Sequence, residues 1–197
     1  MMAGATSGVC AANLVAVSEL WIVPWLRVRT ECLSRAFTGA MVSFLNHHFA
    51  AAIDGVVIPI LKDDNIGTVQ ADFTCKLVRD DLTVEQSTVV FRKFINIEQN
   101  IRREQYVWNE VITTIAQVFI GKKVNIESGD VDGVLKVLRK SSHDLCTSIK
   151  FGMFMKNLIS GYSHVFRSHA PALLEMANSH KSSMKGLLIK CAEKLAN

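Results

Sequence analysis

Three apolar triplets that recur every thirty-eight residues constrain the fold of this chain more than any other feature of its sequence. The triplets are Val69/Phe73/Leu77, Val107/Val111/Ile115 and Leu145/Ile149/Met153. Residues four positions apart form one stripe along an α-helix. A constant offset between such stripes is typical of stacked helical hairpins. The sequence therefore predicts an all-α fold in which antiparallel helical hairpins stack as a HEAT-like α-solenoid.

Length and composition fit one elongated domain with an extended binding surface. The chain has 197 residues, of which 49% are hydrophobic, enough to bury a sizeable core. Residues 1–17 are small and weakly patterned, so we expect a flexible N-terminal segment there. We expect residues 18–197 to form the helical-repeat interaction domain. A solenoid presents an extended surface, and the predicted class of function is therefore binding to another macromolecule.

Charge and cysteine usage point away from several classes of protein. The formal net charge is +4, from 22 basic and 18 acidic residues spread along the chain, which is too mild to indicate nucleic acid by itself. Five widely spaced cysteines predict no disulfide framework and suggest a reducing compartment. The apolar run over residues 8–26 is interrupted by Asn13, Glu19 and Pro24, and no positive charge precedes it. We therefore expect a soluble protein with no membrane partner.

Capping residues and apolar periodicity predict where the helices lie. In the first half we expect a short helix capped by Ser18, then helices over 24–37, 41–61 and 68–79, with loops at 38–39 and 62–67. In the second half we expect a helix ending at Ile95 after a Thr83/Gln86 capping box, a polar connection over 96–103, and a helix over 106–120. We expect one helix capped by Asp130 and another capped by Ser142 that stops at Gly161. A short helix with Pro171 in its first turn and a last helix with an apolar stripe over 184–195 complete the prediction.

The motifs of common catalytic and metal sites are missing from the sequence. The adjacent pair His47-His48 points in two directions on a helix and chelates one ion poorly. The acidic pairs Asp63-Asp64 and Asp80-Asp81 lie at helix ends, where solvated carboxylates are ordinary. His143 and Cys146 have helical spacing without a nucleophile motif, and phosphate-binding glycine loops do not occur. We expect no catalytic residue, no metal site, no cofactor and no enzymatic activity.

Basic and aromatic residues leave two kinds of partner open. Basic groups occur at Arg102-Arg103, Lys122-Lys123, Lys136/Arg139/Lys140 and Lys181/Lys185 with Lys190/Lys194. Such lysines commonly form a solvated helix face, yet together they define an alternative, a helical scaffold that binds nucleic acid through a lysine-rich ridge. Aromatic candidates for partner anchors are Trp21, Trp25, Tyr106, Trp108 and Tyr162. Core packing explains at least half of these aromatic residues equally well.

Several segments resemble one family of helical-repeat proteins. Residues 145–159 (LCTSIKFGMFMKNLI), 172–188 (ALLEMANSHKSSMKGLL) and 192–195 (AEKL) are similar to the end of the Fanconi anaemia group E family. Residues 57–62, 67–70 and 108–112 (WNEVI) resemble the corresponding helices. The likeness covers residues 18–195, the C-terminal helical-repeat domain of that family, and consists of packing patterns without a catalytic motif.

The resemblance implies a function, partners and a location. It implies a non-enzymatic nuclear adaptor of the Fanconi anaemia core complex, which contacts other core-complex subunits. Such an adaptor bridges the group C protein and the group D2 substrate and supports its monoubiquitination in interstrand-crosslink DNA repair. Direct contact with nucleic acid is the less favoured alternative. By the same resemblance, the group C contact is expected on the earlier helices, over residues 21–49.

The resemblance also implies a partner-binding site at the last hairpin. The residues that it assigns to the group D2 contact are His180, Lys181, Ser183, Met184, Lys185 and Leu188. The family pattern has an aromatic residue before the last helix, whereas this chain has Ser182 and Ser183. That departure weakens the expected group D2 contact.

Overall fold

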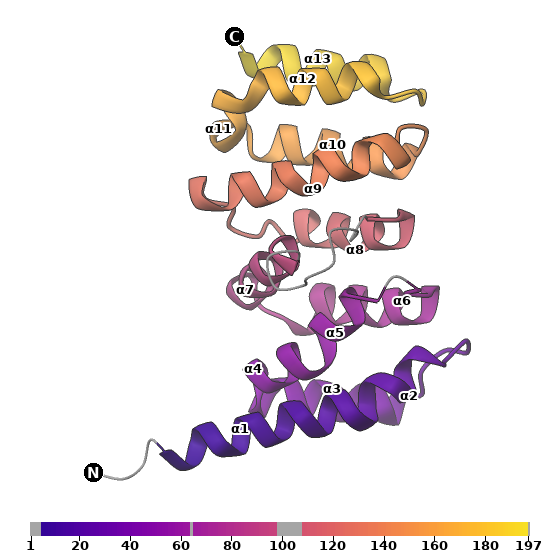
Figure 1. Cartoon of the computed structure of the whole chain (residues 1–197), viewed down its shortest axis with the longest axis vertical. Helices are drawn as coiled ribbons and strands as arrows, with labels where there is room; N and C mark the ends of the chain where they lie inside the picture. Colours follow the sequence, from indigo (N-terminus) through magenta and orange to yellow (C-terminus); the bar gives the residue numbers. More distant parts are fainter. Residues whose placement is uncertain (1–4, 64, 98–107, 197) are drawn as a thin grey trace. The chain divides into compact units, whose positions relative to one another are not determined.

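The computed structural model describes residues 5–63, 65–97 and 108–196, with side chains described over 11–63, 65–97 and 108–195. Across these residues the chain is helical and contains no strand, so the expected all-α class is confirmed. The chain divides into two compact units, Met1–Leu82 and Thr83–Asn197, where the sequence predicted one domain from Ser18. Figure 1 labels the helices along both units.

The first unit begins with a helix where we expected a flexible segment. Helix α1 (Ala5–Val17) continues through a π-helical turn, η1 (Ser18–Ile22), into α2 (Val23–Arg27). It packs against α4 (Phe49–Ala52) and a second π-helical turn, η2 (Ile53–Val57). A Cβ atom on Gly55 would lie 2.8 Å from the Ser18 Cβ and 3.0 Å from the Val15 Cα, so glycine is what permits this close approach. The close approach thus depends on Gly55 of η2, while Ala11, Ala12 and Ala16 of α1 are exposed.

Helix boundaries in the rest of the first unit differ from those predicted. The helix expected over 24–37 ends at Arg27, whose Nε lies 2.7 Å from the Asp63 carboxylate. Helix α3 (Arg35–His47) begins after Ser34, whose hydroxyl accepts a bond from the Phe37 N–H. The helix expected over 41–61 breaks at His48 and continues as α4, η2 and α5 (Ile58–Leu61). The loop predicted at Thr38 and Gly39 is wrong, because the cap at Ser34 starts α3 four residues earlier and both residues lie inside it.

The helix predicted over 68–79 is confirmed as α6 (Thr68–Lys76) followed by η3 (Leu77–Asp81). Phe73 and Leu77 are buried as the first triplet predicts, while Val69 is half-buried. The buried Gln70 amide donates to the backbone carbonyls of Leu26, at 2.6 Å, and Arg29, at 3.0 Å. These bonds link α6 to the end of α2, where the Leu26 carbonyl also accepts the Arg29 N–H at 3.1 Å.

The second unit contains most of the expected helices. They are α7 (Val84–Ile95), α8 (Glu110–Gly121), η5 (Ser128–Asp130), α9 (Val131–Asp144), α10 (Ile149–Gly161), α11 (Ser163–Phe166), η6 (Arg167–His169), α12 (Ala170–Ser179) and α13 (Lys185–Ala196). The Thr83/Gln86 capping box, the stop at Gly161 and Pro171 in the first turn of α12 are confirmed. The cap assigned to Ser142 is wrong, because that residue lies inside α9 and Ser148 caps α10. Expected features over 98–107 lie outside the described residues.

The helices of the second unit pack in two rows. Helix α10 packs between α8 and α13 in one row, and α9 packs between α7 and α12 in the other. The rows meet where α7 contacts α8 and where α12 lies along α13, a pair visible side by side in Figure 1. The buried Phe94 ring stacks on Trp108 at a centroid distance of 4.8 Å, and Trp108 contacts Phe154 at 5.5 Å. Aromatic side chains therefore join the two rows in the core.

Hydrogen bonds in the second unit connect residues thirty-eight positions apart. Arg92 Nε donates to the Asp130 carboxylate at 3.1 Å, Ser148 Oγ donates to Glu110 Oε1 at 2.6 Å, and Tyr162 OH donates to the Val124 carbonyl at 2.8 Å. Glu110 and Ser148 lie at the starts of α8 and α10, and Val124 and Tyr162 lie after their ends, so these two bonds join equivalent positions. The Arg92 bond instead joins the last turn of α7 to the start of α9. The offset that we detected from apolar residues therefore describes real structural equivalence within this unit.

The residues chosen to mark the third stripe were nevertheless wrong. Leu145 is buried but ends α9, whereas Ile149 and Met153 lie on α10 and are exposed. The buried face of α10 is formed by Phe151, Phe154, Met155, Leu158 and Ile159. Met153 and the buried Met155 are two residues apart, about 200° around the helix, so the predicted stripe lies opposite the buried face. In the second triplet Ile115 is buried, Val111 is half-buried and Val107 lies outside the described residues.

Helices long and apolar enough to cross a bilayer were sought throughout the described residues, and none was found.

Two methionines on one helix test the position of that buried face. Met155 is 0% exposed and Met153 is 44% exposed. We expect Met155→Ala to lower the free energy of unfolding by about 2–5 kcal/mol, because it leaves a cavity. Met153→Ala should change it by less than about 0.5 kcal/mol. Urea unfolding followed by circular dichroism measures both, and equal effects would contradict the assigned face.

Tyr162 predicts a loss of stability at alkaline pH. Burial raises the pKa of Tyr162 to about 12, while a tyrosine in the unfolded chain titrates near 10. The unfolded state therefore releases this proton first, and the stability that the group contributes is lost as pH rises from about 10 through about 12. Tyr162→Phe should remove this part of the pH dependence and cost about 1 kcal/mol at neutral pH, since it deletes one hydrogen bond. Unfolding curves of both proteins against pH would measure the difference, and matching slopes would refute it.

Candidate interaction surfaces

An exposed apolar stripe runs along the first helix of the first unit. We call it the tryptophan stripe, and it consists of Val17, Leu20, Trp21, Trp25 and Val28. Spacings of three or four residues place these side chains on one face of the continuous helix formed by α1, η1 and α2. Trp21 is 75% exposed. Exposed apolar patches that contain large aromatic residues mark interaction sites on soluble proteins.

One end of the tryptophan stripe is held in place by aromatic packing. The Trp25 ring lies 4.6 Å from the Phe37 ring, and Phe37 lies 6.1 Å from Phe73, measured between centroids. The Arg29 guanidinium sits 4.1 Å from the centroid of the Trp25 ring, a cation–π contact. Trp25 is therefore oriented before any partner arrives, which lowers the entropy cost of binding.

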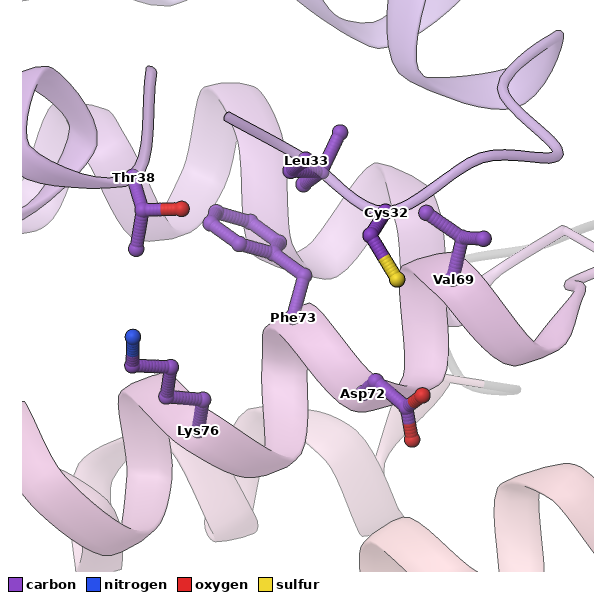
Figure 2. Close-up of a pocket in the computed structure, with 7 residues that line it drawn as sticks. All are labelled: Cys32, Leu33, Thr38, Val69, Asp72, Phe73 and Lys76. Atoms are coloured by element: carbon purple, nitrogen blue, oxygen red, sulfur yellow. The ribbon is translucent and has the colours of Figure 1, made fainter. Parts of the chain in front are cut away.

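A small cavity lies at the other end of this aromatic series. Its volume is about 160 Å³, and its lining residues are Cys32, Leu33, Thr38, Val69, Asp72, Phe73 and Lys76. Figure 2 shows the Phe73 ring at its centre, with the Lys76 amine and the Asp72 carboxylate on opposite sides of that ring. Cofactor pockets usually measure about 300–1,000 Å³. This cavity is the size of a single side chain, such as one apolar anchor from a partner protein.

The last hairpin presents only part of the site that the resemblance assigns to it. Lys181, Ser183 and Lys185 are exposed, and Met184 is half-buried. His180 and Leu188 are buried, so these two residues are not available on the surface. This corrects their assignment as contact residues.

The turn before α13 is tightly packed. A Cβ on Gly152 would lie 2.8 Å from the Met184 Cβ and 2.9 Å from His180 Nε2. His180 Nε2 lies 2.7 Å from Ser182 Oγ, and that hydroxyl accepts a bond from the Met184 N–H. Burial lowers the pKa of His180. Ser182 and Ser183, which differ from the family pattern, lie in the turn before α13. The Ser182 hydroxyl caps this turn by accepting the Met184 N–H.

Residues considered for chemistry are engaged in local structure. His47 Nδ1 lies 2.8 Å from the Ser43 carbonyl of its own helix, His143 pairs with Asp144, and Asp63 pairs with Arg27. Asp64 lies outside the described residues. Groups of three or more histidine, cysteine, aspartate or glutamate residues placed to hold a metal ion do not occur within the described part of the chain.

The basic residues of the second unit lie on both rows of helices. Lys136, Arg139 and Lys140 belong to α9, in the row of α7 and α12, whereas Lys190 and Lys194 belong to α13, in the other row. Arg102 and Arg103 lie outside the described residues. The lysine-rich ridge of the alternative hypothesis is therefore divided between two rows in this unit.

The aromatic candidates also separate into two groups. Trp21 and Trp25 are exposed, whereas Trp108 and Tyr162 belong to the core, and Tyr106 lies outside the described residues. Sequence patterning places Leu20 with Trp21 on one short helix, but Val17 and Val28 were not predicted as further neighbours of the two exposed tryptophans. Their spacing of three and four residues was the available signal, but we had ended the N-terminal segment at Val17.

No protein-family model matches the chain, and no curated protein sequence matches it significantly.

The cavity predicts a difference in reactivity between two cysteines of the first unit. Cys32 is exposed at the cavity, whereas Cys75 is buried on α6 and burial raises its pKa to about 11. The shift from 9.0 lowers the thiolate fraction of Cys75 at neutral pH by roughly a hundredfold. We expect N-ethylmaleimide to label Cys32 at least that much faster, as measured by peptide mass spectrometry. Equal labelling rates would show that α6 does not bury Cys75, and Cys32→Ser confirms the peptide assignment.

Proposed function

We propose that this chain is a non-enzymatic adaptor of the Fanconi anaemia core complex. It acts in the nucleus, holds the group C protein beside the group D2 substrate, and supports monoubiquitination of group D2 in interstrand-crosslink repair. The similarity of residues 145–159 and 172–188 to the group E family is what points to this complex. The tryptophan stripe is the structural observation that supports binding to a protein partner.

At the level of the fold, we infer a HEAT-like α-solenoid. The two rows of helices in the second unit and the hydrogen bonds between residues thirty-eight positions apart support this architecture. In a solenoid each helical pair packs mainly on its neighbours, so the outer faces stay available for partners. Such a scaffold needs no catalytic residue of its own, because a ligase subunit supplies the chemistry.

The tryptophan stripe is the proposed surface for the group C protein. It overlaps residues 21–49, where the resemblance places that contact. A pair of tryptophans supplies large apolar contact area at low entropy cost, and such residues dominate binding energy at protein interfaces. Trp25 is oriented by Phe37 and Arg29, while Trp21 remains exposed to reach into a partner.

The exposed part of the last hairpin is the proposed surface for the group D2 protein. It comprises Lys181, Ser183, Lys185 and the half-buried Met184. Because two lysines lie beside one apolar side chain, this surface fits a partner with acidic residues around an apolar one. Holding both partners on one chain raises their effective concentration, which links them without any new contact between them.

Co-purification of the chain with the group C and group D2 proteins tests this proposal. We expect Trp21→Ala to weaken group C binding by about thirtyfold or more, the loss typical of an interface hot spot of 2 kcal/mol, and to leave group D2 binding intact. Lys185→Glu should have the opposite selectivity. Because each variant should still bind one of the two partners, that retained binding shows that the variant is folded. Circular dichroism would verify its helical content.

A folded parent chain that binds neither protein would refute the adaptor proposal. The alternative would then be a scaffold for nucleic acid, which the exposed lysines of α13 favour. Its affinity for a DNA duplex would fall steeply with added salt, because each phosphate contact releases counterions. Affinity that does not change with salt concentration would exclude that alternative.

A further inference from the structure

A groove follows the C-terminal ends of the helices in one row of the second unit. A cavity of about 540 Å³ lies between the ends of α8 and α10. A smaller one, of about 190 Å³, lies between the end of α10 and α13. Ser160 lines both cavities, so they adjoin and form one groove across three helices of the row. This groove is separate from the tryptophan stripe and from the last turn before α13.

Carboxamide side chains from two neighbouring helices line the groove. Gln117 comes from α8 and Asn157 from α10, and both are half-buried. The Gln117 amide donates one bond to the Lys150 carbonyl at 2.9 Å, which fixes its direction. A carboxamide offers both donors and an acceptor, the complement of a peptide group in an extended chain. The carbonyl groups of Val118, Phe119 and Ile120 at the end of α8 already accept local N–H bonds, so the Gln117 carboxamide oxygen is the acceptor offered to a peptide N–H.

Positive charge occupies the two ends of the groove. Lys123 lies beside α8 and Lys194 on α13, and both are exposed. Among the described residues that line the two cavities, none is acidic. The negative ends of the helix dipoles amount to about half a charge each, less than the full charges of the two lysines. The groove is therefore complementary to carboxylates carried at its ends.

Lys123 has a backbone conformation that favours glycine. Its φ is 58°, in the left-handed region where a side chain costs free energy. Its N–H donates to the Ile120 carbonyl as α8 ends. A glycine at this position would adopt the same backbone conformation at a lower cost in free energy, so the fold does not require the lysine side chain here.

We propose that this groove binds an extended, acidic segment of a partner protein. Gln117 and Asn157 pair with the peptide backbone of the segment, and Lys123 and Lys194 pair with its carboxylates. A peptide fits better than a nucleic acid, because a phosphate backbone has no donor for the Gln117 carboxamide oxygen. The inference stands independently of the Fanconi assignment, since it rests on the second unit alone.

Glycine positions provide a direct test. A Cβ on Gly161 would meet nothing within 4 Å, and the residue lines the groove without a positive φ. Gly161→Leu therefore fills the groove while the core stays unchanged. Gly129 is equally open but lies in η5, away from the groove, and Gly129→Leu is the matched control.

The probe is a short fluorescein-labelled peptide of alternating glutamate and valine, added to the whole chain and followed by fluorescence anisotropy. We expect saturable binding that Gly161→Leu weakens by about tenfold or more and Gly129→Leu leaves unchanged. Lys123→Gly should weaken binding and, at the same time, leave the chain as stable to urea as the parent or more stable. A peptide of alternating lysine and valine should not bind.

Several outcomes would overturn the inference. It fails if the glutamate peptide does not bind at millimolar concentration, or if Gly161→Leu binds it as well as the parent does. It also fails if a single-stranded DNA oligonucleotide displaces the peptide, because the groove would then recognise anions in general. If Gly161→Leu does not fold, Lys123→Gly and Gln117→Ala decide the question, and unchanged affinity in both refutes the proposal.

Discussion

The second unit depends on a cluster of stacked aromatic rings that no single helix could bury by itself. Phe94 of α7 stacks on Trp108, which precedes α8, and on Phe119 within α8, while Trp108 also contacts Phe154 of α10. Large aromatic side chains bury 150–250 Å² each, so four of them dominate the local packing. Because the cluster draws on both rows, it fixes how the rows meet. Side chains on the outer faces of the helices are therefore not needed for packing the two rows together.

Helices in this chain come closest where glycine replaces a larger residue. Gly55 lets η1 lie against η2 in the first unit, and Gly152 lets the turn before α13 lie against α10 in the second. Beside the second contact, Ser182 Oγ accepts a bond from the Met184 N–H just before α13. Within each unit, glycine therefore permits the close packing typical of protein interiors.

Sequence periodicity identified the elements but not their faces. The offset of thirty-eight residues was correct in the second unit, because it follows the length of one helical pair. The stripe assigned to Leu145, Ile149 and Met153 was wrong, because Leu145 follows the last residue of α9 and α10 begins only after Ser148, so the three residues do not share one helix. The break at His48 and the helix before Ser18 depended on tertiary packing, which a single sequence does not display. The tryptophan stripe was predicted only in part: its two tryptophans were identified from the sequence, and the apolar stripe that they form with their aliphatic neighbours was not.

The surfaces of this molecule differ in the physics of the contacts they offer. The tryptophan stripe provides apolar area whose binding is strengthened by releasing water, and it changes little with salt. The groove provides hydrogen bonds and two lysine charges, so its binding depends on geometry and falls as salt rises. A protein that used only the first surface would hold one partner tightly and continuously. With a polar groove in addition, the same chain offers a second surface whose binding weakens as salt rises, so the two surfaces can be distinguished by the salt dependence of binding.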